Sequence, residues 1–236
     1  MSLYKYSFWE VLKHSFSAEV WDKVMPAIGE TMYMVAVSSV FVLIFGVLLG
    51  LILVMTSKEG LVPCKVIHSI LGAVINCFRS LPQVIIIIVM LPVARALVGK
   101  SYGSNACIIS LIASCVPLFA RLVESSLLEI DKGKIEAAKA MGSGNMRILF
   151  TIMVPETLPS LIRAFTNAVV IVISMTALAG SFGAGGIGYI AVTYGYTRYR
   201  HDLLFATIVV LIVIVQAVQL VGDTISKVIL KRRHLI

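Results

Sequence analysis

Charged residues are scarce in this sequence: Asp, Glu, Lys and Arg make up 14% of its 236 residues, and hydrophobic residues make up 59%. An average soluble domain has about 25% charged and roughly 45–50% apolar residues. The mean hydropathy is +0.98, more than a water-soluble fold could bury. The composition therefore excludes a secreted disulfide scaffold, a disordered chain and a water-soluble enzyme, and it predicts a protein that crosses a membrane several times.

Side chains for metal or redox chemistry are few and dispersed. The four cysteines form no CxxC pair, and the four histidines have no ligand spacing. They are Cys64, Cys77, Cys107, Cys115, His14, His68, His201 and His234. We expect the cysteines to be small packing residues. A GxxxxGK[ST] phosphate-binding loop is also absent from the sequence, which therefore offers no ATP site of its own.

Basic residues outnumber acidic ones, 20 to 12, which gives a net charge of +8. No basic run away from the apolar stretches carries interleaved aromatic residues, so we exclude a nucleic-acid partner. Membrane proteins concentrate Lys and Arg on their cytoplasmic side, and the lipid bilayer is the partner that this excess indicates.

Uncharged stretches locate the membrane spans. Residues 31–57 and 203–222 carry no charged side chain, and a helix rising about 1.5 Å per residue crosses a ~30 Å hydrocarbon core over such a length. Together with the other apolar stretches they predict an all-α integral membrane protein with about five transmembrane helices. The predicted spans are 31–55, 66–94, 103–123, 158–178 and 203–225.

The second predicted span contains a break at Arg79-Ser80-Leu81-Pro82. Pro82 has no backbone N–H to donate, and it disfavours helical geometry at Leu81. We expect one long, broken helix that crosses the membrane once. A re-entrant hairpin is the alternative.

The two ends of the chain flank the membrane domain, which we place at residues 31–225. Residues 1–30 mix aromatic and charged side chains, which predicts an amphipathic lead-in at the membrane interface; a disordered leader is the alternative. Residues 226–236 form a basic tail. With the tail in the cytoplasm, the inner face holds 11 Lys and Arg and the outer face 7, so we expect the N-terminus on the outer side.

Residues 124–157 form the one substantial polar segment between spans, and its composition is helical. The alanine-rich stretch 135–141 predicts a short helix, which Gly142 closes in a left-handed conformation. A second helix is expected over 145–154, ending at Pro155.

Small side chains distinguish the first of these two helices. Ala137, Ala138 and Ala140 offer a smooth face that a partner could approach closely, and Glu136 adds one charge. Ser143 or Asn145 would cap the second helix. The alternative is an amphipathic helix that rests on lipid headgroups.

The same segment contains a spaced motif that resembles the EAA loop of permease subunits in ABC importers. Its parts are Glu136-Ala137-Ala138, Gly142 after three more residues, Ile152 after nine more, and Val154-Pro155. Val154 stands where the family usually has Leu, and Gly144-Asn145 stands where many members have Ser-Pro. The resemblance implies that the loop, residues 132–155, couples the spans to an ATPase.

The resemblance extends over roughly residues 28–225 and is greatest to methionine-type importer permeases. The similar segments are Gly29-Glu30-Thr31-Met32-Tyr33-Met34-Val35, Phe78-Arg79-Ser80-Leu81-Pro82, Ala177-Leu178-Ala179-Gly180, and Tyr194-Gly195-Tyr196 with Arg198. It implies a type I importer fold in the bacterial inner membrane. It also implies a homodimeric permease, two cytoplasmic ATPase subunits that carry the ATP and Mg, no cofactor on this chain, and an external methionine-binding protein.

Candidate residues for a translocation path come from the spans. Two candidates, Arg79 and Pro82, lie at the break in the second span. Arg79 is an ionisable group within a span, which by default indicates function; snorkelling, or bonding to carbonyls freed at Pro82, is the alternative. The resemblance implies that Ser174 and Met175 line the path and that Leu178 lies near its gate. Packing is the alternative role for Ser and Thr in a span.

Residues 183–188 formally match GxGxxG, but a membrane span precedes them and an aromatic outer loop, 189–199, follows them. A dinucleotide site needs a strand before the glycines and a soluble helix after them. We therefore expect these glycines to allow a tight turn or close helix packing.

Three other functions are the alternatives to methionine import. An ion-driven secondary transporter would show repeats and acidic residues within the spans, and a membrane-embedded enzyme would need convergent catalytic groups there. The sequence has neither pattern. Within the ABC class, the alternative is a permease for another small solute, such as a polar amino acid or a phosphonate.

Overall fold

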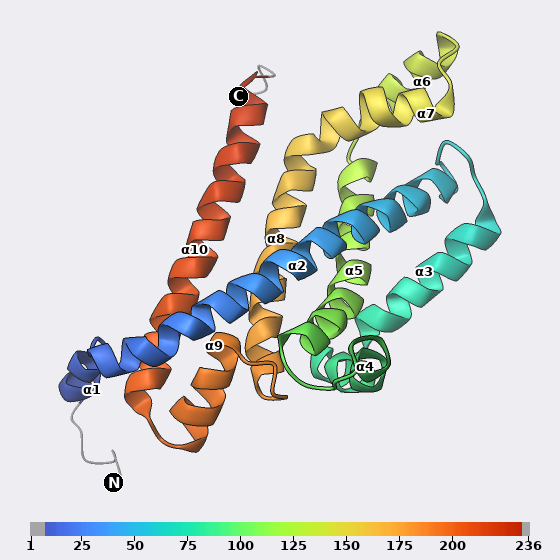
Figure 1. Ribbon diagram of the computed structural model, residues 1–236. Helices are drawn as coiled ribbons and strands as arrows, with labels where there is room; N and C mark the ends of the chain where they lie inside the picture. The colour runs from blue at the N-terminus through green and yellow to red at the C-terminus, as the bar shows by residue number, and fades with distance from the viewer. Residues whose placement is uncertain (1–7, 233–236) are drawn as a thin grey trace. The chain divides into compact units, whose positions relative to one another are not determined.

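The computed structural model describes residues 8–232 as a succession of helices, with no strand in that range (Figure 1). The helices are α1 (Phe8–His14), α2 (Ala18–Thr56), α3 (Lys65–Ser80), α4 (Gln83–Val98), α5 (Ser104–Leu128), α6 (Lys132–Ala140), α7 (Asn145–Ile148), η2 (Leu149–Met153), α8 (Val154–Gly180), α9 (Gly186–Tyr189), η3 (Ile190–Thr197) and α10 (His201–Arg232). The segments labelled η are π-helical.

Four helical segments are long and apolar enough to cross a membrane: α2, α5, the continuous segment Asn145–Gly180, and α10. The predicted spans 31–55, 158–178 and 203–225 each lie within one of them, and 103–123 does so except for its first residue. The pair α3 and α4 passes the same test together, with a bend of 108° at its break, which brings the number to five. The all-α, multi-pass membrane fold is thus confirmed. A bend of this kind occurs in a broken span and in a re-entrant hairpin alike, so the single crossing stays a prediction.

The predicted break in the second span is confirmed. α3 ends at Ser80, and Leu81 is extended, with φ −81° and ψ 137°. Pro82 then precedes the first residue of α4, with φ −55° and ψ 135°. The chain therefore leaves helical geometry at the residue before proline, where the proline ring disfavours it.

The predicted stop at Pro155 is wrong. α7 passes without interruption into η2, and α8 begins at Val154 and continues through Pro155 to Gly180. A proline inside a regular α-helix leaves the carbonyl four residues earlier without a donor. Here the wider π turn of η2 comes first, so Pro155 falls in the first turn after the change of register, where proline is tolerated.

The predicted outer loop and most of the predicted lead-in are helical. Most of the predicted aromatic loop 189–199 belongs to η3. In the predicted lead-in, α1 covers Phe8–His14, and α2 begins at Ala18 and passes residue 30 without a break, so a disordered leader is wrong for this part. Residues 1–7 and 233–236, which include part of the predicted basic tail, lie outside the described residues.

The chain divides into two compact units whose boundaries fall mostly inside helices. Unit 1 comprises Met1–Val40, Pro82–Ser114 and Val169–Val218. Its core is an apolar cluster made by α2, η3, α9 and α10, with Trp21, Tyr189 and Tyr194 packed around it. The buried members are Val20, Val24, Ala27, Ile187, Ile190, Leu203, Ala206 and Val210.

Unit 2 comprises Phe41–Leu81, Cys115–Ala168 and Gln219–Ile236. Within it, two glycines of α2 leave no room for a side chain of their own against α5. A Cβ added to Gly46 would lie 2.5 Å from Phe119 Cδ1, and one added to Gly50 would lie 2.8 Å from the carbonyl oxygen of Ala120. Small residues allow helix backbones in a membrane to approach this closely, so these contacts fix α2 against α5.

A polar contact joins α3 to α5 in the same unit. Arg121 donates to the Gly72 carbonyl at 3.2 Å and to Asn76 Oδ1 at 3.0 Å. It also pairs with Glu124 at 2.6 Å on its own helix. An arginine this largely enclosed is stable because a carboxylate and carbonyl groups face it.

Candidate functional site

The predicted coupling loop lies in unit 2, and its first helix begins at an aspartate cap. The Asp131 side chain accepts a hydrogen bond from the Gly133 N–H at 2.8 Å, so α6 starts at Lys132 rather than at Ile135 as predicted. Aspartate at this position satisfies a backbone donor that the helix leaves free. The capping signal was present in the sequence and was missed.

The end of α6 confirms the prediction for Gly142, whose φ is +78°. The Gly142 N–H donates to the Lys139 carbonyl at 2.9 Å, and the Ser143 N–H donates to the Ala138 carbonyl at 3.0 Å. These two bonds define a Schellman ending, in which glycine takes the left-handed position. The chain thereby reverses sharply between α6 and α7.

The predicted side-chain cap of the second helix is wrong. Gly144, not Ser143 or Asn145, precedes α7 as its cap residue, and it makes no side-chain hydrogen bond. Its extended backbone, with φ −70° and ψ 154°, follows directly from the reversal at Gly142. Glycine is acceptable at this position, and the departure from the family pattern at Gly144-Asn145 therefore leaves the helix start intact.

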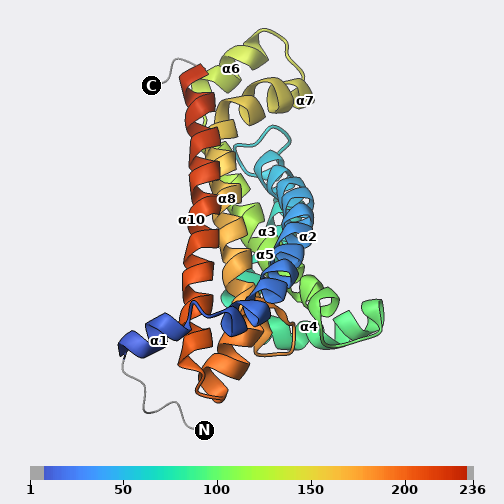
Figure 2. The same ribbon diagram turned by 60° about the vertical axis from the view of Figure 1, so that its left-hand side comes forward.

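The alanines of α6 do not share one open face. α6 packs against α7 and η2 (Figure 2), and Ala138 is only 1% exposed, whereas Ala137, Ala140 and Glu136 are exposed. Ala138 is buried because its side chain lies on the inner side of the reversal, where only a small residue fits. The residues left open to a partner are therefore Glu136, Ala137 and Ala140.

Large apolar side chains add to this open surface, and sequence reasoning missed them. Met141 is 79% exposed, Met146 is 59% exposed and Phe150 is 54% exposed. The signal was present, because Met146 and Phe150 stand four residues apart and so share a helix face. Exposed apolar groups of this size, grouped on a short reversal, are typical of a surface that another protein covers.

Ion pairs hold the loop to the rest of unit 2. Lys132 pairs with Glu59, in the turn after α2, and Lys134 pairs with Glu156 in α8. The hydrogen bond that Lys132 donates to Glu59 holds the pKa of the Glu59 carboxyl below its ordinary value and raises the pKa of Lys132. Ser160 also donates to Glu129 at 2.9 Å. These contacts attach the loop to the turn after α2 and to α8.

The remaining motif residues, Ile152 and Pro155, are half-buried and lie on either side of the junction between η2 and α8. The structure thus brings the whole predicted motif together on one compact reversal. Within the motif, Ala138 is buried, whereas Glu136 and Ala137 are exposed.

The predicted path residues are divided between the units. Ser174, Met175 and Leu178 lie on α8 in unit 1: Ser174 and Leu178 are exposed, four residues apart, whereas Met175 is fully buried. The Ser174 hydroxyl donates to the Val170 carbonyl at 3.0 Å, so it leaves its acceptor lone pairs free. The exposed stripe of Ser174 and Leu178 is what this helix can present to a substrate.

The other two path candidates flank the break between α3 and α4. Pro82 is exposed in unit 1, and Arg79 is exposed in unit 2. Arg79 is among the described residues and has no hydrogen bond or ion pair, including none to the carbonyls freed at the break. Its charge is therefore open to solvent, lipid headgroups or another chain.

The glycine-rich turn after Leu178 is held by two residues that sequence reasoning did not single out as site residues. Glu30 Oε2 accepts from the Gly186 N–H at 2.6 Å, and Thr31 Oγ1 accepts from the Ile187 N–H at 2.9 Å. The expectation of close packing by these glycines is confirmed, because a Cβ on Gly188 would lie 2.5 Å from Ala177 Cα.

Comparison with known proteins agrees with this geometry. Residues 43–234 match the family described as "Binding-protein-dependent transport system inner membrane component". A probable D-methionine transport system permease protein MetI of Vibrio cholerae is 38% identical over 206 residues, which cover 87% of this chain and 92% of that protein. The methionine import system permease protein MetP of Bacillus subtilis is 42% identical over 181 residues, covering 77% of this chain and 82% of that one.

A solved structure is similar along almost its whole length. The MetNI methionine ABC transporter in inward-facing conformations contains a chain that matches with a TM-score of 0.88 and 34% identity, covering 91% of this chain and 99% of its own. An amino acid ABC transporter matches at 15% identity with a TM-score of 0.69, which shows a shared fold.

The fold and the loop define a multi-pass membrane subunit of a transport system. The chain belongs to the family of inner membrane components of binding-protein-dependent transport systems.

Proposed function

We propose that this chain is the permease subunit of an ATP-driven importer of methionine. The observation that carries the proposal is the likeness to the MetNI chain, at 34% identity and a TM-score of 0.88 over 91% of this chain. The relatives named as methionine permeases, at 38% and 42% identity, support the same substrate. Two copies of the chain, two ATPase subunits and an external binding protein would make up the importer.

In this proposal the loop from α6 to η2 is the contact with the ATPase. Glu136, Ala137, Met146 and Phe150 supply the surface, and the reversal at Gly142 sets its shape. The packing of α6 against α7 and η2 is supported by the less exposed motif residues Ala138, Ile152 and Pro155. ATP and Mg belong to the partner subunit, and this chain moves the solute without a chemical step.

The arrangement in the membrane follows from the charge distribution. The loop and the basic tail, residues 226–236, would face the cytoplasm, and the lead-in, residues 1–30, the outer side. The pair α3 and α4 then crosses once within the membrane domain, residues 31–225. Ser174 and Leu178 would line the path, with Met175 behind them and with Arg79 and Pro82 at the break.

ATP-dependent uptake into vesicles tests the proposal. The chain, co-expressed with its ATPase and reconstituted in lipid vesicles with the binding protein outside, should accumulate radiolabelled methionine when ATP is inside. Uptake should stop when ATP is replaced by a non-hydrolysable analogue or when the binding protein is omitted. Excess unlabelled glutamine or a methylphosphonate should not compete. If radiolabelled methionine is not accumulated while radiolabelled glutamine or methylphosphonate is, the permease has another substrate.

A further inference from the structure

The segment between η3 and α10 exposes a group of aromatic and cationic side chains in unit 1. Tyr196 is 75% exposed and Tyr199 is 58% exposed, and Arg198 between them is exposed as well. Tyr and Arg are the side chains that protein–protein interfaces favour, because each combines a large contact area with a polar end. No role in the coupling loop or in the path uses them.

The backbone of this segment is held in a conformation that costs free energy. Tyr199 has φ +56° and is the one non-glycine residue with positive φ in the described part of the chain. Its N–H donates to the Tyr196 carbonyl at 3.3 Å, and the next N–H, that of Arg200, donates to the Tyr194 carbonyl at 3.1 Å. Strain of this kind persists where surrounding contacts enforce it, and it concentrates at functional sites.

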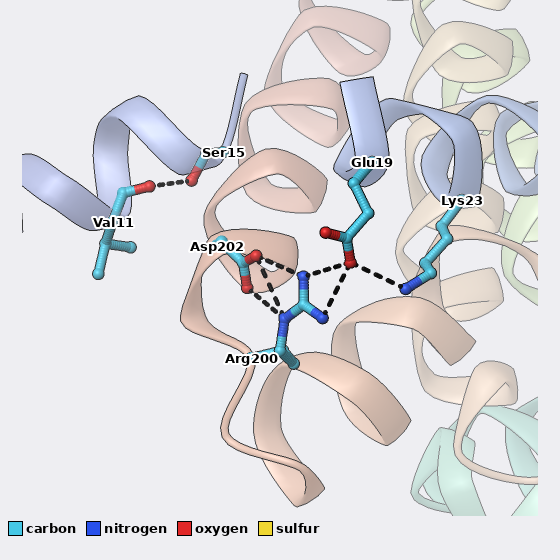
Figure 3. Close-up of polar contacts among 6 residues, drawn as sticks. All are labelled: Val11, Ser15, Glu19, Lys23, Arg200 and Asp202. Atoms are coloured by element: carbon cyan, nitrogen blue, oxygen red, sulfur yellow. Dashed lines mark hydrogen bonds and ion pairs between the residues drawn. The ribbon is translucent and has the colours of Figure 1, made fainter. Parts of the chain in front are cut away.

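The residue that follows Tyr199, Arg200, is held by several polar contacts (Figure 3). Its guanidinium binds Asp202 through Nε at 2.9 Å and through Nη2 at 2.7 Å, and it binds Glu19 of α2 at 3.3 Å. Lys23 reaches the same Glu19 oxygen at 3.4 Å. A planar guanidinium that binds two carboxylates fixes the orientation of its own side chain and the position of the backbone that carries it, which the single ammonium group of a lysine could not do.

Arg198 is positioned differently from Arg200. Its guanidinium carbon lies 4.6 Å from the centre of the Tyr194 ring, so the cation is stacked on the protein surface. Among the described residues it forms no ion pair, whereas Arg200 is paired with Glu19 and Asp202. The segment therefore presents one fixed positive charge between two exposed tyrosines.

We propose that Tyr196, Arg198 and Tyr199 form a docking surface for the extracytoplasmic binding protein of this transport system, which presents a carboxylate to Arg198. Arg200 is the positioning residue that keeps the surface in its binding shape. The inference rests on the proposed function, because that function supplies the partner and places this segment on the outer side.

A membrane interface would also accept tyrosines and arginines, but two observations favour a protein partner. Side chains that anchor in headgroups need no particular backbone, whereas Tyr199 has a positive φ directly before an arginine that is bound to two carboxylates. An arginine that pairs with lipid phosphates extends outward, whereas Arg198 is stacked back on Tyr194.

Stimulation of ATP hydrolysis by the binding protein measures docking directly. The permease–ATPase complex in lipid nanodiscs is titrated with methionine-loaded binding protein at low and high salt. Arg198→Glu should raise the half-saturating concentration about tenfold at low salt, and Tyr196→Ala should raise it by a similar factor. Lys100→Glu, a charge reversal at another exposed loop position of unit 1, should change it about twofold or less.

The positioning role of Arg200 has its own readout. Arg200→Gln should raise the half-saturating concentration of the binding protein more than it lowers the maximal rate of ATP hydrolysis. Arg200→Lys should restore little, since lysine cannot bind both carboxylates in the same plane. A lower maximal rate with unchanged half-saturation would refute the positioning role.

The possible outcomes separate the inference from the proposed function. If the wild-type complex does not respond to methionine-loaded binding protein, the proposed function fails. If the wild type responds and Arg198→Glu and Tyr196→Ala behave like the wild type, the docking surface is refuted. If these variants instead dissociate from the lipid or lose thermal stability without any change in half-saturation, the segment is a membrane anchor, and the docking proposal is equally refuted.

Discussion

Replacing Gly142 by alanine would test the coupling loop at the position where the backbone alone decides the result. Gly142 has φ +78°, and a Cβ added there meets nothing within 4 Å. The substitution therefore costs the strain of a left-handed L-residue and adds no clash, about 1–2 kcal/mol. That cost disfavours the Schellman ending of α6 by a factor of about 5–30.

A series at the same position separates the backbone effect from the effect of a side chain. Asparagine adopts left-handed geometry more readily than other residues with a Cβ, so Gly142→Asn should retain most of the native ending. Valine is β-branched and unfavourable there, so Gly142→Val should be the most damaging. We expect coupling to fall in the order Gly, Asn, Ala, Val.

The assay is ATPase retention together with ATP-driven uptake, each at matched amounts of permease in the membrane. The complex is purified through a tag on the permease, and the bound ATPase is quantified at several dilutions. The reversal shapes the docking surface, so retention and uptake should fall together along the series, while the permease itself keeps its thermal stability.

Two results would refute this reasoning. If Gly142→Val retains its ATPase and transports as the wild type does, the shape of the α6 ending is irrelevant to coupling. If Gly142→Asn is as defective as Gly142→Val, the loss follows side-chain size at a tight interface, and the left-handed backbone is not the cause.

Other predictions concern packing, charge and the apolar surface of the loop. Gly188→Ala should lower the thermal unfolding midpoint of the purified complex, because its Cβ would lie 2.5 Å from backbone atoms of α8, whereas Gly29→Ala, with nothing within 4 Å, should not. The Glu59–Lys132 pair should protect α6 amides from hydrogen exchange near neutral pH. Since the pKa of Glu59 is lowered in the fold, this protection should disappear as the pH falls through that pKa, and Glu59→Gln should abolish its pH dependence. Met146→Gln should weaken ATPase retention without changing permease stability, because the side chain is 59% exposed; normal retention would remove it from the interface.

Local sequence rules anticipated the features that depend on one residue and its neighbours. Pro82 ended a helix because its ring acts on the residue before it, and Gly142 closed α6 because the alanine-rich run stopped there. The Schellman bonds themselves span only a few residues, so a local pattern was enough to predict them.

Features that depend on distant partners could not be read in this way. The bond from Gly186 to Glu30 joins residues 156 positions apart, and burial of Ala138 depends on a reversal that brings η2 back against α6. The π-helical register of η2 depends on which carbonyl each N–H meets, and no residue type encodes it. For this reason Pro155 was predicted to stop a helix that in fact continues.

The glycine contacts of unit 2 have a consequence for how that unit deforms during transport. At Gly50, α2 lies directly against the Ala120 carbonyl and the β-branched Val123 side chain of α5, which has little rotamer freedom with which to absorb a displacement. The link from Arg121 to α3 is a long, jointed side chain, which can keep its hydrogen bonds while α3 moves. We therefore expect spin labels on α2 and α5 within unit 2 to keep one distance with and without ATP, and labels on α3 and α5 to show two; a second distance between α2 and α5 would contradict this. In unit 2, α2 and α5 would then move as one rigid pair, and α3 would change its position relative to them while Arg121 keeps it bound to α5.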